Sequence, residues 1–181
     1  MTILDRLLAH DAWTTRQLLL RCRELPPEQW MRKFDIGDRS LAGTFEHIIA
    51  CMESHTDLIL GRKTREYFLA SKAIRDHETL EGMLKRLTVV AKDFAEAALG
   101  TERDGAADEM VANPENGNLR SRGGVIAHIV THGMHHRAQI LFMLEQLGVQ
   151  NTIEGDVLGW EAQARGWGWD DGGSVGSPVA G

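Results

Sequence analysis

One stretch of the sequence, from residue 125 to residue 148, combines the periodicity of a helix with an unusual density of histidine. Four of the eight histidines fall between His128 and His136. Apolar residues recur at helical spacing, and Gly148 stands where a helix C-terminus commonly places glycine. The pattern predicts a helix of about six turns. On such a helix His132 and His136 lie one above the other, and His128 lies one further turn back on nearly the same stripe.

This histidine stripe can hold a divalent metal ion, because neutral imidazole is a common metal ligand and an i, i+4 pair lets two rings converge. The alternative is that the histidines are hydrogen-bonded core or surface residues. The segment from His128 to His132 lacks the glutamate of the H-E-x-x-H zinc-protease motif, and the chain has no Glu-x-x-His of the di-iron type. The stripe therefore indicates a metal site without either of these two mechanisms.

The length and charge of the chain narrow the class of protein. A chain of 181 residues is expected to form one main domain with its own core. It carries 20 basic residues against 26 acidic ones, and its lysines and arginines form no stripe. Nucleic acid is therefore not an expected partner, because binding to a phosphate backbone needs clustered positive charge.

The sequence also suggests a compartment. The charged residues Asp5 and Arg6 near the N-terminus interrupt any apolar core of a signal peptide. No apolar run elsewhere approaches the length needed to span a membrane. Cys22 and Cys51 are far apart in the sequence and have no C-x-x-C spacing, which suits free thiols in a reducing compartment. The sequence alone does not exclude a disulfide between them. We expect a cytoplasmic protein with no membrane partner.

Hydrophobic periodicity predicts three further long helices, at approximately residues 2–24, 40–61 and 76–99. Thr2 and Ser40 are the expected caps of the first two helices, and Gly100 is expected to close the third. With the histidine helix they predict an all-α fold, an up-down-type four-helix bundle. The long loop between the third and fourth helices, residues 101–124, is either a binding lid or a crossing of the bundle end.

The chain is expected to divide into a bundle domain, residues 1–160, and a C-terminal tail, residues 161–181. Trp160 is expected to pack on the bundle together with Leu158. The last dozen residues are rich in Gly, Ser, Pro and Ala, a composition typical of flexible segments. The remaining tryptophans of this region are Trp167 and Trp169. The sequence is compatible with three alternatives for them: they cover the metal site, fill a subunit interface, or stay exposed.

The second predicted helix offers a third ligand for the histidine stripe. His47 follows the core register set by Thr44 and Ile48, so its ring is expected to point toward the helix that packs opposite. If that helix is the histidine helix, His47 completes a three-ligand site. Otherwise His47 is a buried, hydrogen-bonded histidine. Cys51 and His55 follow at i+4 and i+8, and a free cysteine is usually a small core residue.

Asp11 lies on the apolar stripe of the first predicted helix. A carboxylate on a core-facing stripe costs free energy unless it is paired or hydrogen-bonded. Asp11 is therefore either a partner that supports the histidines or a residue turned to solvent by rotation of the helix.

Four segments together resemble the DinB/YfiT-like superfamily of metal-binding four-helix bundles. They are Leu8–Trp13, Leu25–Gln29, Thr44–Ile49 and His128–Gln139. The last is similar to the family's H-x-x-H-H-R-G-Q signature, and the resemblance covers roughly residues 3 to 160. Ala138 replaces the usual glycine of the signature, and no tryptophan follows His47 in the second helix. The second departure concerns the substrate pocket rather than the metal.

By this resemblance the metal ligands are His47, His132 and His136, while His128 and His135 are their neighbours. Histidine-only ligation suits zinc or nickel, with iron, copper or manganese as alternatives. The resemblance further implies that Asp11 and Arg137 are candidates for catalytic or supporting contacts.

The resemblance implies a metal-dependent enzyme that acts on a small-molecule substrate. Characterised relatives suggest a thiol S-transferase or isomerase, in which a metal-activated low-molecular-weight thiol attacks an electrophile. A hydrolase is a further possibility, and analogy with relatives suggests a homodimer. Two rival interpretations are a non-catalytic bundle stabilised by its metal and, if the histidines face solvent, a metal-free interaction module.

Overall fold

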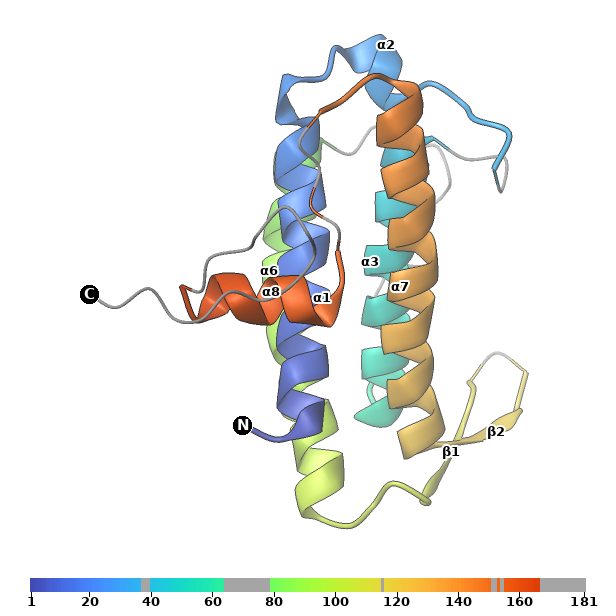
Figure 1. Cartoon of the computed structure of the whole chain (residues 1–181). Helices are drawn as coiled ribbons and strands as arrows, with labels where there is room; N and C mark the ends of the chain where they lie inside the picture. Colours follow the sequence, from blue (N-terminus) through green and yellow to red (C-terminus); the bar gives the residue numbers. More distant parts are fainter. Residues whose placement is uncertain (37–39, 64–78, 115, 151–152, 154, 167–181) are drawn as a thin grey trace.

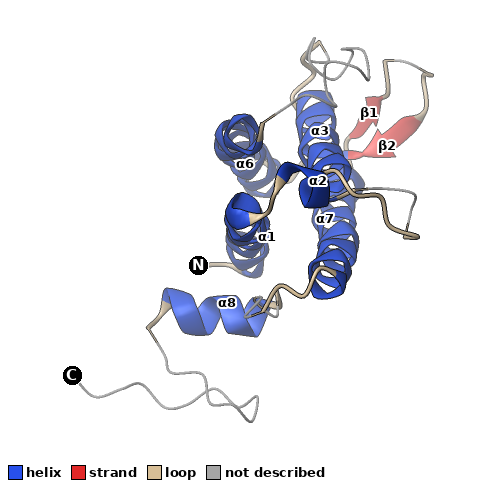
Figure 2. Ribbon diagram, turned by 90° about the horizontal axis from the view of Figure 1, so that it is seen from above, coloured by secondary structure: helices blue, strands red, loops and turns tan. Residues whose placement is uncertain are grey.

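The computed structural model describes residues 1–36, 40–63, 79–114, 116–150, 153 and 155–166 (Figure 1). Its framework is four long helices: α1 (Ile3–Arg21), α3 (Leu41–Ile59), α6 (Leu80–Arg103) and α7 (Arg122–Gln146). The helices α1 and α3 each pack against both α6 and α7, and the four axes are seen nearly end-on in Figure 2. The predicted all-α four-helix bundle is confirmed.

Ion pairs between neighbouring helices reveal their relative directions. Glu53 of α3 pairs with Arg86 of α6, and Arg62, just after α3, pairs with Asp93 further along α6. Residue numbers thus rise together along α3 and α6, which makes these helices parallel. The helices α1 and α7 run in the opposite direction (Figure 1). As a result α7 lies antiparallel to α3, and the middle of one faces the middle of the other.

The helix ends show the capping chemistry that the sequence predicts. The Thr2 hydroxyl accepts a hydrogen bond from the backbone N–H of Asp5 at 3.1 Å, and the Asp5 carboxylate accepts one from the backbone N–H of Thr2 at 2.6 Å. Ser40 caps α3 by accepting from the N–H of Gly43 at 3.1 Å. Gly148 follows α7 with a φ of 73°, a left-handed conformation that glycine adopts without steric cost.

The core lies between the four long helices. Each of them contributes side chains that are almost completely buried, among them Leu18, Leu19, Phe45, Ile49, Val90, Ile140 and Leu144. Burying one such side chain stabilises a fold by roughly 1.5–3 kcal/mol. This packing holds α3 and α7 at a fixed separation and thereby positions the side chains between them.

The structure corrects the expected boundaries around the third helix and the following loop. The helix α6 continues through Gly100 to Arg103, because Thr101 extends its buried face and donates its hydroxyl hydrogen bond to the Ala97 carbonyl at 2.9 Å. Residues 76–78 of the expected helix lie outside the described residues. The expected loop holds a short antiparallel hairpin, β1 (Met110–Ala112) and β2 (Leu119–Ser121).

The start of α7 also differs from the prediction. The helix begins at Arg122, three residues before the expected start at residue 125, and Ser121 caps it by accepting a hydrogen bond from Gly124 at 3.1 Å. The two glycines at positions 123 and 124 do not prevent this turn, because a side-chain cap satisfies a free backbone donor there. At Gly123 a Cβ atom would lie 3.1 Å from the Ala107 carbonyl oxygen, so glycine also allows the segment between α6 and β1 to approach.

Three short helices complete the described chain: η1 (Cys22–Glu24), α2 (Pro27–Trp30) and α8 (Val157–Ala164). The helix α8 packs on α1 and buries Trp160, as expected, but Leu158 is exposed, so its expected packing beside Trp160 is wrong. The expected division between residues 160 and 161 falls inside α8 and stays a prediction. The predictions of a flexible tail and of the roles of Trp167 and Trp169 concern residues that lie outside the described ones.

Two further observations bear on the expected environment of the protein. Among the described residues, no helix has both the length and the apolar character needed to cross a membrane. Cys22 and Cys51 are both buried free thiols, so they do not form the disulfide that the sequence alone could not exclude.

Candidate metal centre

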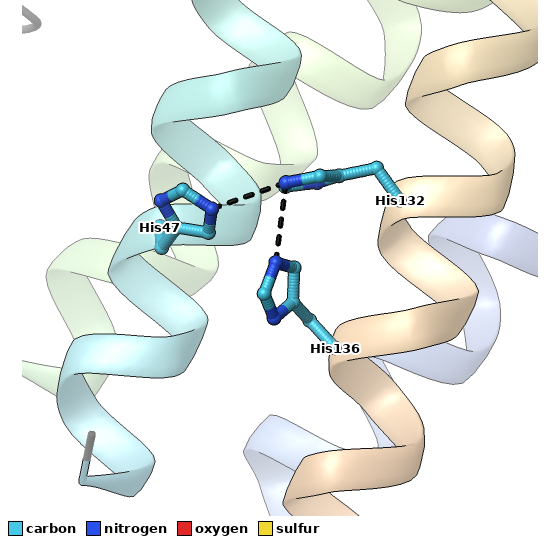
Figure 3. A group of neighbouring side chains, drawn as sticks. All are labelled: His47, His132 and His136. Carbon is cyan, nitrogen blue, oxygen red and sulfur yellow. Dashed lines mark hydrogen bonds between the residues drawn. The ribbon is translucent and has the colours of Figure 1, made fainter. Parts of the chain in front are cut away.

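Three histidines meet between α3 and α7. The Nε2 atom of His132 lies 3.1 Å from the Nε2 atom of His47 and 3.1 Å from the Nε2 atom of His136. Figure 3 shows His47 reaching across from α3 to the two histidines of α7. The antiparallel arrangement of the helices, together with the i, i+4 spacing of His132 and His136, brings the three rings to one point. The structure thus places together the three residues that the sequence analysis singled out.

The geometry of this cluster fits the ligand set of a divalent metal ion. In a tetrahedral zinc site with bonds of about 2.05 Å, neighbouring nitrogen ligands are separated by about 3.3 Å. The two separations of 3.1 Å are close to that value, and one donor atom from each of the three histidines lies within 4.8 Å of the others. Lone pairs that converge so closely repel one another unless a proton or a cation lies among them, so this donor set suits a cation.

Burial prepares His132 for this role. Desolvation, reinforced by the neighbouring rings of His136 and His47, lowers the pKa of His132 to about 3. The imidazole of His132 is therefore neutral at neutral pH, which is the protonation state that a metal ligand requires. His136 is buried, and His47 and His132 are half-buried, so the reading in which the histidine stripe faces solvent does not apply to these three residues.

Gln139 fixes the orientation of His136. The Nδ1 atom of His136 donates a hydrogen bond to the side-chain carbonyl oxygen of Gln139, at 2.7 Å. Because that oxygen can only accept, the proton of His136 sits on Nδ1, and the lone pair of Nε2 points into the cluster. The amide nitrogen of Gln139 in turn donates to Nε2 of His135, at 3.2 Å. His135 is exposed and supports the cluster from outside.

Asp11 and Arg137 form a buried ion pair beside the cluster. The Arg137 guanidinium donates to the Asp11 carboxylate, and the two side chains are 3% and 1% exposed. Asp11 is therefore not turned to solvent, and its carboxylate contacts Arg137 rather than a histidine. Burial raises the pKa of the Asp11 carboxyl, and the positive charge of Arg137 opposes that change. The pair connects α1 to the part of α7 that carries His136.

Three residues that support the site were not predicted from the sequence. Gln139 orients His136, Thr15 accepts a hydrogen bond from Arg137 at 3.2 Å, and Gly133 makes room for the ion pair. The position of Gln139, three residues after a candidate ligand, is the one signal in the sequence that could have indicated such a role. The contributions of Thr15 and Gly133 depend on the packing of α1 against α7, which the sequence of either helix alone does not reveal.

Cys51, His55 and His128 gather one helical turn from the three-histidine cluster. The ring centre of His128 lies 5.1 Å from that of His132 and 5.1 Å from that of His55. Cys51 is buried, and burial raises the pKa of its thiol to about 11. The donor atoms of these three residues form a group of their own, separate from His47, His132 and His136.

Taken together, the fold and the site define a class of protein. It is a four-helix bundle in which α3 supplies one histidine to a candidate metal site and the antiparallel α7 supplies two. The sequence agrees with this class. The model of the DinB family matches residues 1–162, and the chain belongs to that family.

Individual relatives are distant in sequence and similar in fold. Protein DinB of Bacillus subtilis (strain 168) is 20% identical over 150 residues, which span 79% of this chain and 85% of the relative. A crystal structure assigned to the DinB family from Exiguobacterium sibiricum 255-15 superposes with a TM-score of 0.60 at 22% identity, over 86% of this chain and 99% of that one. A DinB-like protein from Bacillus cereus ATCC 10987 gives 0.56 at 18% identity, over 80% and 92%.

Proposed function

We propose that this protein is a metal-dependent enzyme that holds one divalent ion with His47, His132 and His136 and acts on a small electrophilic substrate. The observation that supports the proposal is the convergence of three imidazole nitrogens at a half-buried point between two helices, where Nε2 of His132 lies 3.1 Å from Nε2 of His47 and 3.1 Å from Nε2 of His136. Three protein ligands leave one tetrahedral position for a substrate atom, which is the arrangement of catalytic rather than structural zinc sites.

The chain's own residues have distinct tasks in this proposal. The three histidines hold the ion, Gln139 keeps His136 in the tautomer that binds it, and the Asp11–Arg137 pair holds α7 against α1. When bound, a divalent ion supplies a Lewis acid that lowers the pKa of a thiol and polarises a carbonyl group. Zinc and nickel suit three imidazoles best, and iron, copper or manganese are the alternatives.

The reaction that we propose is transfer or isomerisation with a low-molecular-weight thiol as co-substrate, in a cytoplasmic homodimer. Family resemblance suggests this chemistry, and the open ligand position is compatible with it. The buried Asp11 and Arg137 have their charges committed to one another. We therefore assign these two residues to positioning the histidines rather than to contact with substrate.

Metal content is the first test of the proposal. Protein purified without an affinity tag and analysed for metals is expected to lose one equivalent of divalent ion when His132 and His136 are both replaced by alanine. The matched control is His10→Gln, which changes a buried histidine outside the cluster and keeps a donor for its hydrogen-bond partner. Equal metal content in the double variant and the wild type would contradict the three-histidine site.

Turnover is the second test. Metal-loaded protein is expected to consume thiol in the presence of small electrophiles such as epoxides or activated aryl halides, and His132→Ala is expected to abolish this reaction. A panel without any turnover by the loaded protein would refute the enzymatic proposal, even if the metal binds.

A non-catalytic role is the second candidate function. The three histidines come from two helices, so a bound ion would connect α3 to α7 and stabilise the bundle by its binding free energy. This role predicts a rise in Tm on metal addition without turnover, whereas the enzymatic role predicts both.

A further inference from the structure

The three-histidine cluster is one end of a longer row of metal-binding side chains. On α3 the residues His47, Cys51 and His55 follow one another at four-residue intervals. On the antiparallel α7, His128 lies opposite His55, with 5.1 Å between their ring centres. The row therefore continues for one helical turn beyond His132.

Cys51, His55 and His128 meet closely enough to share one ion. The Cys51 sulfur lies 3.4 Å from Nδ1 of His55, and one donor atom from each of the three residues lies within 4.8 Å of the others. A tetrahedral zinc ion with bonds of about 2.3 Å to sulfur and about 2.05 Å to nitrogen separates these ligands by about 3.5 Å. The donor atoms of the group lie within 4.8 Å of one another, so small side-chain movements bring them to that separation, and the exposed His128 is the ligand with room to move.

The hydrogen bonding of His55 favours ligation. Nδ1 of His55 donates to the Cys51 backbone carbonyl at 2.9 Å, so the ring carries its proton on Nδ1 and keeps a lone pair on Nε2. A ring N–H fixed by a backbone carbonyl is the usual support of a metal-binding histidine. The competing explanation is structural: Cys51 is a small core residue and His55 only bonds to the preceding helical turn.

Burial is graded across the group. Cys51 is buried at 8% exposure, His55 is half-buried and His128 is exposed. An ion can therefore enter from the side of His128 and find a thiol that bulk solvent does not reach.

We propose that Cys51, His55 and His128 form a second metal site, separate from the three-histidine cluster, for a borderline divalent cation that accepts sulfur, with zinc as the prime candidate. Binding replaces the Sγ–H bond of Cys51 by a bond from Sγ to the metal and releases one proton to solvent. The thiolate distinguishes this site from its neighbour, because sulfur ligands favour zinc over harder ions such as magnesium or manganese.

Charge balance is compatible with two ions in adjacent sites. The thiolate reduces the charge of an occupied second site from +2 to +1 and thereby weakens repulsion from an ion at His132. Arg120 of β2 lies near enough to His55 to disfavour positive charge on its ring. The same thiolate offsets this repulsion.

Cobalt(II) is the probe that separates the two sites. A thiolate bound to cobalt gives a near-ultraviolet charge-transfer band, whereas a site with only imidazole ligands gives none. Titration of the metal-free full-length protein is expected to show two equivalents, one of them accompanied by this band. Cys51→Ala is expected to remove the band and one equivalent. Cys22→Ala, which changes the other buried thiol, is the matched control and should alter neither.

Two further variants make the result decisive. His128→Gln changes an exposed residue, so its fold is not in question, and it should shift the band to higher cobalt concentration. The double variant His132→Ala, His136→Ala should keep the band and lose the other equivalent, which separates this proposal from that of the three-histidine site.

Three results would overturn the second site. The first is a wild-type titration without the band, and the second is a band that persists in Cys51→Ala. The third is a single equivalent whose band disappears in the double histidine variant, because Cys51 would then complete the three-histidine cluster instead.

Discussion

Arg137 of α7 donates a hydrogen bond to the carboxylate of Asp11 of α1, and this contact lies one residue beyond His136. The same Nη1 atom donates to the Thr15 hydroxyl at 3.2 Å, so α1 holds the guanidinium at two points. A residue next to a candidate ligand is thereby fixed to a different helix. The pair restrains the rotation of α7 about its axis, and the directions of His132 and His136 depend on that rotation.

Replacing Asp11 by asparagine tests the stabilising effect of this pair. The change keeps the shape of the side chain but leaves the Arg137 charge buried without its counterion, so we expect the free energy of unfolding to fall by about 3 kcal/mol. Urea denaturation monitored by circular dichroism measures the change. The control is Asp104→Asn, which breaks an exposed pair with Arg103 and should cost less than about 1 kcal/mol. Equal small losses in both variants would show that the buried pair stabilises the fold no more than an exposed pair does.

Gly133→Ala tests the close approach of α1 to α7. A Cβ atom at this position would lie 2.6 Å from Oδ1 of Asp11 and 2.9 Å from Nη1 of Arg137, and both side chains are held by burial. We expect a loss of about 1–3 kcal/mol in the free energy of unfolding, although alanine has the higher helix propensity.

Gly100→Ala in α6 is the matched control for Gly133. The nearest neighbour of a Cβ atom there is the flexible end of Arg103 at 3.6 Å, so we expect no loss and a gain of up to about 1 kcal/mol. If thermal denaturation shows that both alanine variants are stabilised, the packing around Gly133 is looser than the contacts indicate.

The helices were predictable because their signals are local. The apolar periodicity, the capping box of Thr2 and Asp5, and Gly148 after the histidine helix each depend on a few neighbouring residues. The same holds for the convergence of His132 and His136, which follows from four-residue spacing. For His47 the register indicated an inward direction, and family resemblance supplied the partner helix.

The remaining features depend on tertiary packing, which these local signals do not contain. Gly100 is a residue at which a helix often ends, but burial of Thr101 beyond it stabilises the continuation of α6. Strands of three residues, as in β1 and β2, are too short to show the alternation of apolar and polar residues by which a strand is recognised in a sequence. The pairing of Asp11 with Arg137 required knowledge that α1 packs beside α7, and the parallel course of α3 and α6 is equally a property of the whole bundle.

Gln139→Leu tests whether the hydrogen bond to His136 prepares the site for metal. Loss of the Gln139 carbonyl frees the His136 ring to rotate and to change tautomer, so we expect affinity for zinc to fall by about 10- to 100-fold. Competition with a chromophoric chelator measures the affinity. The control is Gln146→Leu, an exposed glutamine at the end of the same helix. Unchanged zinc affinity in Gln139→Leu would show that packing alone orients His136.

Protonation of His10 is expected to destabilise the fold at acidic pH. His10 is buried between α1 and the segment before α8, and its Nε2–H donates to the Gly155 carbonyl at 2.7 Å. Burial lowers the pKa of His10 below its ordinary value of 6.5. Above pH 6.5 the ring is neutral in both the folded and the unfolded chain, so His10 does not make stability depend on pH. Below pH 6.5 the unfolded chain binds a proton that the folded chain excludes, and stability falls as the pH falls.

Between pH 7.5 and pH 5.5 this linkage removes up to about 1.4 kcal/mol from the free energy of unfolding. His10→Gln keeps an N–H donor for Gly155 but cannot titrate, so its loss over the same interval should be smaller by up to that amount. Urea denaturation of both proteins at the two pH values provides the comparison. His55 and His132, whose pKa values are also lowered, are present in both proteins, so their contributions cancel in the difference. Identical pH dependence in the two proteins would mean that His10 takes up its proton as readily in the folded chain as in the unfolded one.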